Sequence, residues 1–95
     1  MNQGQFVLVT TDHNNRGVFA GVFESQTGTT VYLTAARMVI YWDQSTHGVV
    51  GLAKNGPGPA CRISPAAPEI ELAKVTCVMA CTDEAVVEFL KEPWG

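Results

Sequence analysis

The residues best suited to bind a ligand lie in two segments, "TAARMVIYW" (34–42) and "ACRISP" (60–65). An arginine guanidinium is a planar fork that pairs with carboxylate or phosphate oxygens, and an aromatic ring offers a face for stacking. One candidate site is therefore a pocket for a small anionic, nucleotide-like ligand, formed by Arg37, Tyr41, Trp42, Arg62 and Ser64. The alternative is that the arginines form ion pairs at the surface and the aromatic side chains fill the core.

Groups that could perform catalysis are sparse. The sequence contains no Walker loop and no G-x-G-x-x-G, G-x-S-x-G or H-E-x-x-H motif. Cys61 and His47 could serve as nucleophile and base, but nothing in their spacing favours that pairing. Glu69 and Glu71 share one side of an extended segment, a pattern that is also typical of a solvated strand edge. We therefore predict that the protein is not an enzyme and needs no cofactor.

The three cysteines do not suggest a disulfide or a metal site. In "CVMAC", Cys77 and Cys81 lie on a predicted strand, where four residues separate two Cβ atoms by about 13 Å. A disulfide requires Cα atoms within roughly 7 Å of each other. No pair of ligands has the spacing of a zinc finger. We expect all three, Cys61 included, to be free thiols that act as small buried hydrophobic residues in a reducing, cytoplasmic compartment.

Length and charge limit the function classes further. A chain of 95 residues with 46% hydrophobic content fits one domain, residues 1–95. The net charge is −3 and the six Lys and Arg residues are scattered singly, which argues against nucleic acid as a partner. The first residues lack the basic start and apolar core of a signal peptide. No apolar run approaches the roughly 20 residues of a membrane span, so we expect no membrane association.

Short β-rich segments at roughly ten-residue spacing predict an antiparallel meander. Two polar stretches, "DHNNRG" (12–17) and "QTGT" (26–29), have the composition of tight turns. The expected strands are residues 5–11, 17–25, 30–34, 37–42 and 48–53, with a further strand in "KVTCVMACT" (74–82).

The rest of the chain predicts one irregular segment and one helix. Residues 54–69 carry four prolines, so we expect an ordered excursion across the sheet, with "CRI" (61–63) as an edge strand. Residues 82–95 form the only convincing helix, begun by Thr82 or Asp83 and stopped by Pro93. Its apolar stripe is expected to be Val86, Phe89 and Leu90.

Both faces of the predicted sheet are apolar. In residues 37–42, the side chains of Arg37, Val39 and Tyr41 alternate with those of Met38, Ile40 and Trp42. One short helix cannot bury two apolar faces, so either the sheet curls or a second subunit covers it. The expected fold class is therefore mostly β (α+β), a small antiparallel meander forming a barrel or sandwich with one C-terminal helix. Self-association is expected, and the alternative is a monomeric barrel with ordinary aromatic residues at its surface.

Six stretches of the chain together carry a resemblance: "RGVFAG", "LTAARMVIYW", "GLAKNGP", "CRIS", "CTDEAV" and the closing "PW". In these stretches the sequence resembles a family of short, uncharacterised proteins from bacteriophages and prophages. The resemblance implies a phage accessory protein in the cytoplasm of a bacterial host and transfers no catalytic residue.

Two functions follow as hypotheses. The first is a non-catalytic, homo-oligomeric interaction module, either structural or directed at a host protein. The second is a protein that sequesters a small anionic, nucleotide-like ligand used as a defence signal. For Arg37 we expect a strand edge beside a subunit contact, with a ligand contact as the alternative.

Overall fold

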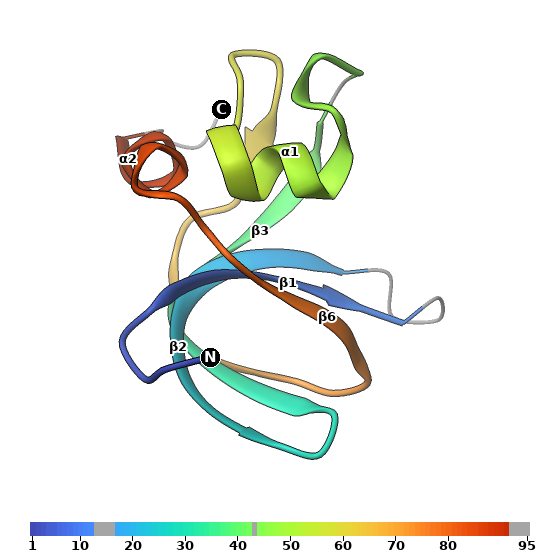
Figure 1. The fold of residues 1–95 in the computed structure, drawn as a ribbon, viewed down its shortest axis with the longest axis vertical. Coiled ribbons are helices and arrows are strands. Elements are labelled where there is room, and N and C mark those ends of the chain that lie inside the picture. The colour runs from blue at the N-terminus through green and yellow to red at the C-terminus, as the bar shows by residue number, and fades with distance from the viewer. Residues whose placement is uncertain (13–16, 43, 92–95) are drawn as a thin grey trace.

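The computed structural model describes residues 1–12, 17–42 and 44–91 and has the mostly β architecture that the sequence predicts (Figure 1). Among the described helices, none has both the length and the apolar character needed to cross a membrane. In chain order the elements are β1 (Phe6–Thr11), β2 (Val18–Thr27), β3 (Thr30–Tyr41), the 3-10 helix η1 (Gln44–Thr46), α1 (Gly48–Asn55), β4 (Arg62–Ile63), β5 (Ala67–Leu72), β6 (Val75–Ala80) and α2 (Asp83–Lys91).

All strand pairs are antiparallel, and β3 is the centre of the sheet. The main path runs β4-β3-β2-β1-β6, and β5 pairs with the first half of β3 on the side where β4 pairs with its second half. Among the described strands, β5 and β6 follow each other in the chain but do not pair. The curved sheet is therefore open, and of the two predicted forms the closed barrel is not present (Figure 1).

Strand β3 replaces two of the predicted strands, 30–34 and 37–42. Ala35, between the two predicted strands, has a positive φ of 50°. The strand nevertheless continues, because Thr34 and Arg37 on either side of this segment both pair with β2. The register with β2 shifts between Ala20 and Val22, as at a β-bulge, which increases the local bend of a sheet. Gly21 lies at this shift, where a Cβ atom would stand 2.9 Å from the Ala36 Cα. The close contact of β2 and β3 thus requires glycine.

The predicted strand at residues 48–53 is wrong, because these residues form α1. The residues that pack toward the core are Val49, Leu52 and Ala53, an i, i+3, i+4 spacing, whereas Val50 is exposed. This spacing is typical of a helix, although valine and glycine have low helix propensity. Residues 82–95 therefore do not contain the only helix.

Most other predicted elements are confirmed. β4 is an edge strand within "CRI", β6 lies within 74–82, and Gly28 forms the turn between β2 and β3 with a φ of 60°. In α2 the predicted stripe is partly wrong, because the buried residues are Ala85 and Phe89 while Leu90 is 67% exposed. The predicted turn residues 13–16 and the predicted helix stop at Pro93 lie outside the described residues.

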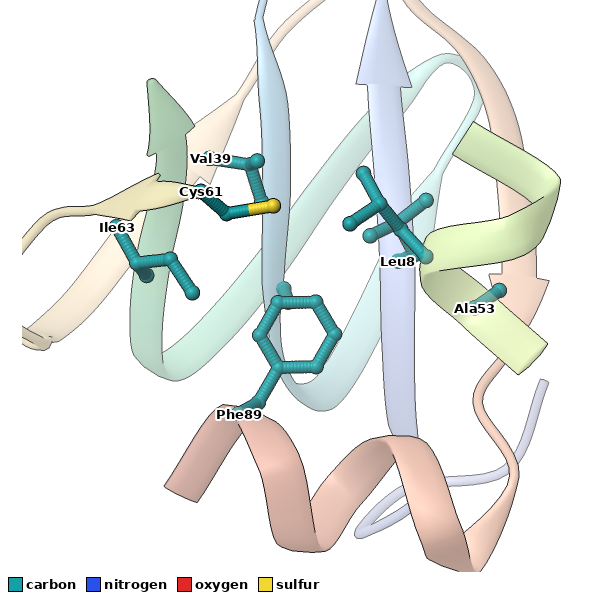
Figure 2. Packing of buried hydrophobic residues seen from close by; sticks show 8 residues of the cluster. Leu8, Val39, Ala53, Cys61, Ile63 and Phe89 are labelled. Carbon is teal, nitrogen blue, oxygen red and sulfur yellow. The ribbon is translucent and has the colours of Figure 1, made fainter. Parts of the chain in front are cut away.

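Two hydrophobic clusters occupy the two faces of the sheet. On β1, Leu8 belongs to one cluster while Val7 and Val9 belong to the other, as alternation along a strand requires. The first cluster lies against the helices and includes Leu8 and Ala53 of α1, and Figure 2 shows the Phe89 ring pointing from α2 into it. The second lies between the curled strands and comprises Val7, Val9, Phe23, Val31, Leu33, Ala36 and Leu72.

The two apolar faces of the sheet are both buried within one chain. The curl of the sheet buries one face, and α1, α2 and β4 bury the other. Covering the sheet therefore does not require a second subunit. Self-association stays a prediction, and it requires an exposed interface other than the faces of the sheet.

Candidate functional site

The predicted ligand residues lie around the corner where β4 pairs with the end of β3. Val39 lies opposite Ile63, and Tyr41 lies opposite Arg62. Val39 and Ile63 are buried in the cluster beneath the helices, which fixes this short edge strand to the core. The proline-rich segment before β4 cannot extend the ladder, because proline has no N–H to donate. The corner is therefore a short, anchored piece of sheet.

An exposed apolar surface covers this corner, and we call Met38, Ile40, Tyr41 and Arg62 the corner surface. Met38 and Ile40 alternate with buried Val39 along β3, so their side chains point outward. The register with β4 shifts between Val39 and Tyr41. Simple alternation predicted that Tyr41 shares the buried face of Val39. Because of the register shift, Tyr41 is exposed instead.

Three of these residues line an open hollow. Ile40, Tyr41 and Arg62 surround a space of about 410 Å³. Ile40 is 50% exposed and Tyr41 is 51% exposed. Arg62 is also exposed, and in the described part of the chain its guanidinium has no hydrogen bond or ion pair. The hollow therefore combines an apolar wall, an aromatic ring and a cation.

Arg37 lies beneath the corner and is engaged within the chain. Its side chain is 9% exposed. Its Nε donates a hydrogen bond to the Ser64 carbonyl oxygen at 2.8 Å, and its Nη1 donates one to the Phe89 carbonyl oxygen at 2.6 Å. Arg37 thus connects β3 to the segment after β4 and to the last turn of α2.

Ser64 completes this connection. Its Oγ accepts a hydrogen bond from the Met38 backbone N–H at 2.8 Å and donates one to the Pro65 carbonyl oxygen at 2.9 Å. Its own backbone N–H donates to the Met38 carbonyl oxygen at 2.9 Å. The hydroxyl therefore extends the β3–β4 ladder by one residue beyond the two that form strand β4.

Trp42 is directed elsewhere. It is half-buried and packs against the cluster beneath the helices, together with residues such as Phe6 and Val49. It does not line the corner hollow.

The five predicted residues thus divide into three groups. The structure brings Tyr41 and Arg62 together at the hollow, joins Arg37 to Ser64 beneath it, and places Trp42 against the core. The sequence interpretation missed Met38 and Ile40. Their signal was present, because alternation along β3 places them opposite the face that carries Arg37.

A second, larger hollow of about 490 Å³ is acidic. Glu24, Glu69 and Glu71 line it together with Tyr32 and Thr34. The Thr34 hydroxyl donates a hydrogen bond to the Glu24 carboxylate at 3.0 Å. Glu69 and Glu71 are both exposed on β5, as the sequence predicted for an extended segment. Within the described residues, no group of three or more His, Cys, Asp or Glu side chains is placed to hold a metal ion.

The cysteines are free thiols in three different environments. Cys61 is buried, Cys81 is half-buried and Cys77 is exposed. The prediction that all three are buried is therefore wrong for Cys77. Burial raises the pKa of the Cys81 thiol to about 11, which keeps it protonated and unreactive near neutral pH.

Comparison with known proteins yields one match. Neither the curated proteins nor the solved structures searched contain a match to the chain. Residues 4–89 match the model of the family described as "Domain of unknown function (DUF6948)", and because this match spans most of the chain, the protein belongs to that family.

Proposed function

We propose that the protein is a non-catalytic interaction module that binds a partner protein through the corner surface and assembles into a homo-oligomer. The observation that supports binding is the exposed group of Met38, Ile40, Tyr41 and Arg62 on one anchored corner of the sheet. Methionine, tyrosine and arginine are enriched in the cores of protein interfaces, and tyrosine and arginine are also enriched among the residues that dominate binding energy.

The hydrogen bonds beneath the corner surface also favour binding. Arg37 and Ser64 hold β3, the segment after β4 and the end of α2 in one arrangement through hydrogen bonds of 2.6–2.8 Å. A surface that is already ordered loses less conformational entropy when a partner binds. The exposed Arg62 guanidinium favours a partner that presents a carboxylate next to an apolar patch.

A second candidate function is the sequestration of a small anionic, nucleotide-like ligand. Arg62 and Tyr41 favour it, because they place a guanidinium fork and an aromatic ring at the same hollow of about 410 Å³. Arginine pairs with phosphate oxygens and a tyrosine ring stacks on a base. Arg37 and Ser64 belonged to the predicted pocket but contribute their polar groups to the fold instead.

We also infer that the protein is a phage accessory protein that acts in the bacterial cytoplasm. The inference rests on the resemblance to short phage and prophage proteins and on the three free cysteines, which suit a reducing compartment.

Native mass spectrometry tests the proposed function. The protein is purified from cells under conditions gentle enough to retain bound molecules, and its mass is compared with that of the bare chain. A discrete oligomer that carries a second protein supports the interaction module. An oligomer that carries a few hundred daltons per chain supports sequestration instead, and fragmentation identifies the ligand. A bare monomer contradicts the proposal.

Two variants connect the result to the corner surface. Tyr41→Ala and Arg62→Glu remove exposed groups and should release the bound protein. Lys54→Glu is the matched control, because it makes the same change of charge at an exposed position on α1. If all three variants retain the partner, the corner surface is not its binding site. Arg37→Glu is not informative, since Arg37 is buried and supports the fold.

A further inference from the structure

Asn55 and Gly56 form the only Asn-Gly pair in the sequence, and they lie where α1 ends. Such a pair can react with itself, because glycine has no Cβ atom to keep its backbone nitrogen away from the asparagine side chain. The Gly56 nitrogen attacks the Asn55 Cγ and closes a five-membered succinimide ring, while the side-chain nitrogen takes up the amide proton and leaves as ammonia. Water then opens the ring at either carbonyl and yields aspartate or isoaspartate.

The Asn55 side chain is exposed to water, but its backbone is held in a helix. The Gly56 N–H donates to the Leu52 carbonyl oxygen at 2.9 Å, which is the i to i−4 bond of an α-helix. The ψ torsion of Asn55 is therefore close to the helical value of about −42°. The nearly planar ring requires the Gly56 nitrogen and the Asn55 Cβ on the same side of the Cα–C bond, which a helical ψ does not provide. The hydrogen bond also retains the proton on the attacking nitrogen.

The end of α1 is fastened to the segment before α2, with which it is in contact (Figure 1). The last carbonyl groups of a helix have no partner within the helix. In α1 the Ala53 carbonyl oxygen accepts a hydrogen bond from the Thr82 backbone N–H at 3.0 Å, and the Lys54 carbonyl oxygen accepts one from the Thr82 hydroxyl. The turn that contains Asn55 therefore opens only when α1 separates from Thr82.

The reaction products do not fit this closed arrangement. Both place a carboxylate at the negative end of the α1 dipole, beside Glu84 and Glu88, which line the same hollow of about 300 Å³ as Asn55 and Gly56. Isoaspartate in addition inserts the side-chain methylene into the main chain. Gly56 leaves no space for it, because even a Cβ atom there would stand 2.6 Å from the Glu88 Cβ and 3.0 Å from the Ala85 carbonyl oxygen.

We propose that Asn55–Gly56 is a deamidation site controlled by the joint between α1 and α2. The closed joint keeps Asn55 unreacted, an opening of the last turn of α1 allows the reaction, and the product prevents the joint from closing again. The site is separate from the corner surface and does not depend on the proposed function.

Site-specific deamidation rates test the proposal in the unaltered protein. The protein is incubated in mildly alkaline buffer with and without urea, and aspartate and isoaspartate at position 55 are quantified by mass spectrometry after digestion. Asn55 should react readily in the unfolded chain and at least about tenfold more slowly in the folded protein. Equal rates would show that the fold does not restrain the reaction. No reaction in urea would show that the pair is not a deamidation site.

A variant at Thr82 identifies the restraint. Thr82→Ala removes the hydroxyl that holds the Lys54 carbonyl, so the reaction in the folded protein should accelerate about 5- to 30-fold, the change in population that loss of a helix cap produces. Thr82→Ser keeps the hydroxyl and should react at the rate of the unaltered protein. If alanine and serine give the same rate, Thr82 does not control the turn and the proposal is wrong.

A second control separates local opening from complete unfolding. Gly21→Ala disturbs the contact of β2 and β3 and should lower the stability of the sheet without changing the rate at Asn55. If Gly21→Ala accelerates the reaction as much as Thr82→Ala, Asn55 reacts only in the unfolded chain, and control by the joint is contradicted.

The effect of the product is measured separately. Chains with isoaspartate at position 55 are isolated by chromatography, and exchange of the Gly56 amide hydrogen is compared with that in unreacted chains. The exchange should be at least about tenfold faster in the modified chains, because the bond to the Leu52 carbonyl oxygen is lost. Asn55→Gln is the matched control, since glutamine keeps the amide but would have to close a less favourable six-membered ring, and its Gly56 amide should stay protected. Equal protection in modified and unreacted chains would show that the joint closes again, contrary to the proposal.

Discussion

The guanidinium of Arg37 donates a hydrogen bond to the backbone carbonyl oxygen of Phe89 at 2.6 Å. Carbonyl groups in the last turn of a helix have no partner within the helix, and a cation there is favoured by the helix dipole. Because Arg37 is buried, water does not compete for this bond. Arg37, which was expected at a strand edge beside a subunit contact, with a ligand contact as the alternative, is thus a buried residue that joins the central strand of the sheet to α2.

Replacing this arginine should destabilise the fold. Arg37→Met keeps most of the side-chain volume but removes both hydrogen bonds, so the partly buried Ser64 carbonyl and the buried Phe89 carbonyl lose their donor. We expect the free energy of unfolding to fall by about 3 kcal/mol. Urea unfolding followed by circular dichroism measures the change. The control is Arg62→Met, which alters an exposed side chain and should stay within about 0.5 kcal/mol. Equal losses in the two variants would contradict the role assigned to Arg37.

The position of Arg37 in its strand could be predicted, but its partners could not. Alternation correctly placed Arg37 and Val39 on one face of β3. The chemical type of arginine suggested that this position meets water, because buried arginines are rare. Its partner Phe89 lies 52 residues further along the chain, on a helix whose packing depends on the whole core. No local pattern indicates such a contact.

Gly21 should not tolerate a side chain. In Gly21→Ala, the new Cβ atom would stand 2.9 Å from the Ala36 Cα and 3.0 Å from the Thr34 carbonyl oxygen, both backbone atoms of β3. Separating the strands should cost roughly 1–3 kcal/mol of unfolding free energy. Gly58→Ala is the control, because nothing lies within 4 Å of its Cβ position. Thermal unfolding of the two variants should differ clearly, and similar melting temperatures would argue against close packing at the bulge.

The helix at residues 48–55 shows where a sequence pattern is ambiguous. "GVVGLA" contains valine and glycine, which disfavour a helix, yet its apolar residues follow helical spacing. A run of six residues is too short to distinguish the helical period of 3.6 residues from the strand period of two. Tertiary packing decides the outcome, since Leu52 and Ala53 are buried in the cluster beneath the helices. The strands β1 and β6 are also six residues long, but they contain no glycine and are rich in β-branched residues, and they were predicted correctly.

Thr82 caps α2 and also fastens it to α1. Its hydroxyl oxygen accepts a hydrogen bond from the Ala85 N–H at 3.1 Å and donates one to the Lys54 carbonyl oxygen. Thr82→Ala removes both bonds and should lower the free energy of unfolding by about 1–2 kcal/mol, measured by urea titration. Thr82→Ser keeps the hydroxyl and is the matched control. The capping role fails if serine and alanine destabilise the protein equally.

The three cysteines should differ in their rates of alkylation. At pH 8, iodoacetamide should modify exposed Cys77 first, and mass spectrometry of digested protein can locate the label. Cys61 is buried and should react only when the protein unfolds. Cys81 should be slow because burial raises its pKa to about 11, which leaves very little thiolate at pH 8. Rapid labelling of Cys81 in the folded protein would contradict its protected environment.

The raised pKa of Cys81 also predicts a dependence of stability on pH. In the unfolded chain the thiol ionises around its usual pKa of 9.0, but in the folded protein it remains protonated up to about 11. A group whose pKa is higher in the folded state contributes its full stability below pH 9.0 and loses it as the pH rises toward 11. The free energy of unfolding should therefore decrease across this interval. In Cys81→Ser, which has no group that titrates there, the decrease should be smaller. If both proteins lose stability in parallel, other groups cause the decrease and the Cys81 thiol is not shielded by the fold.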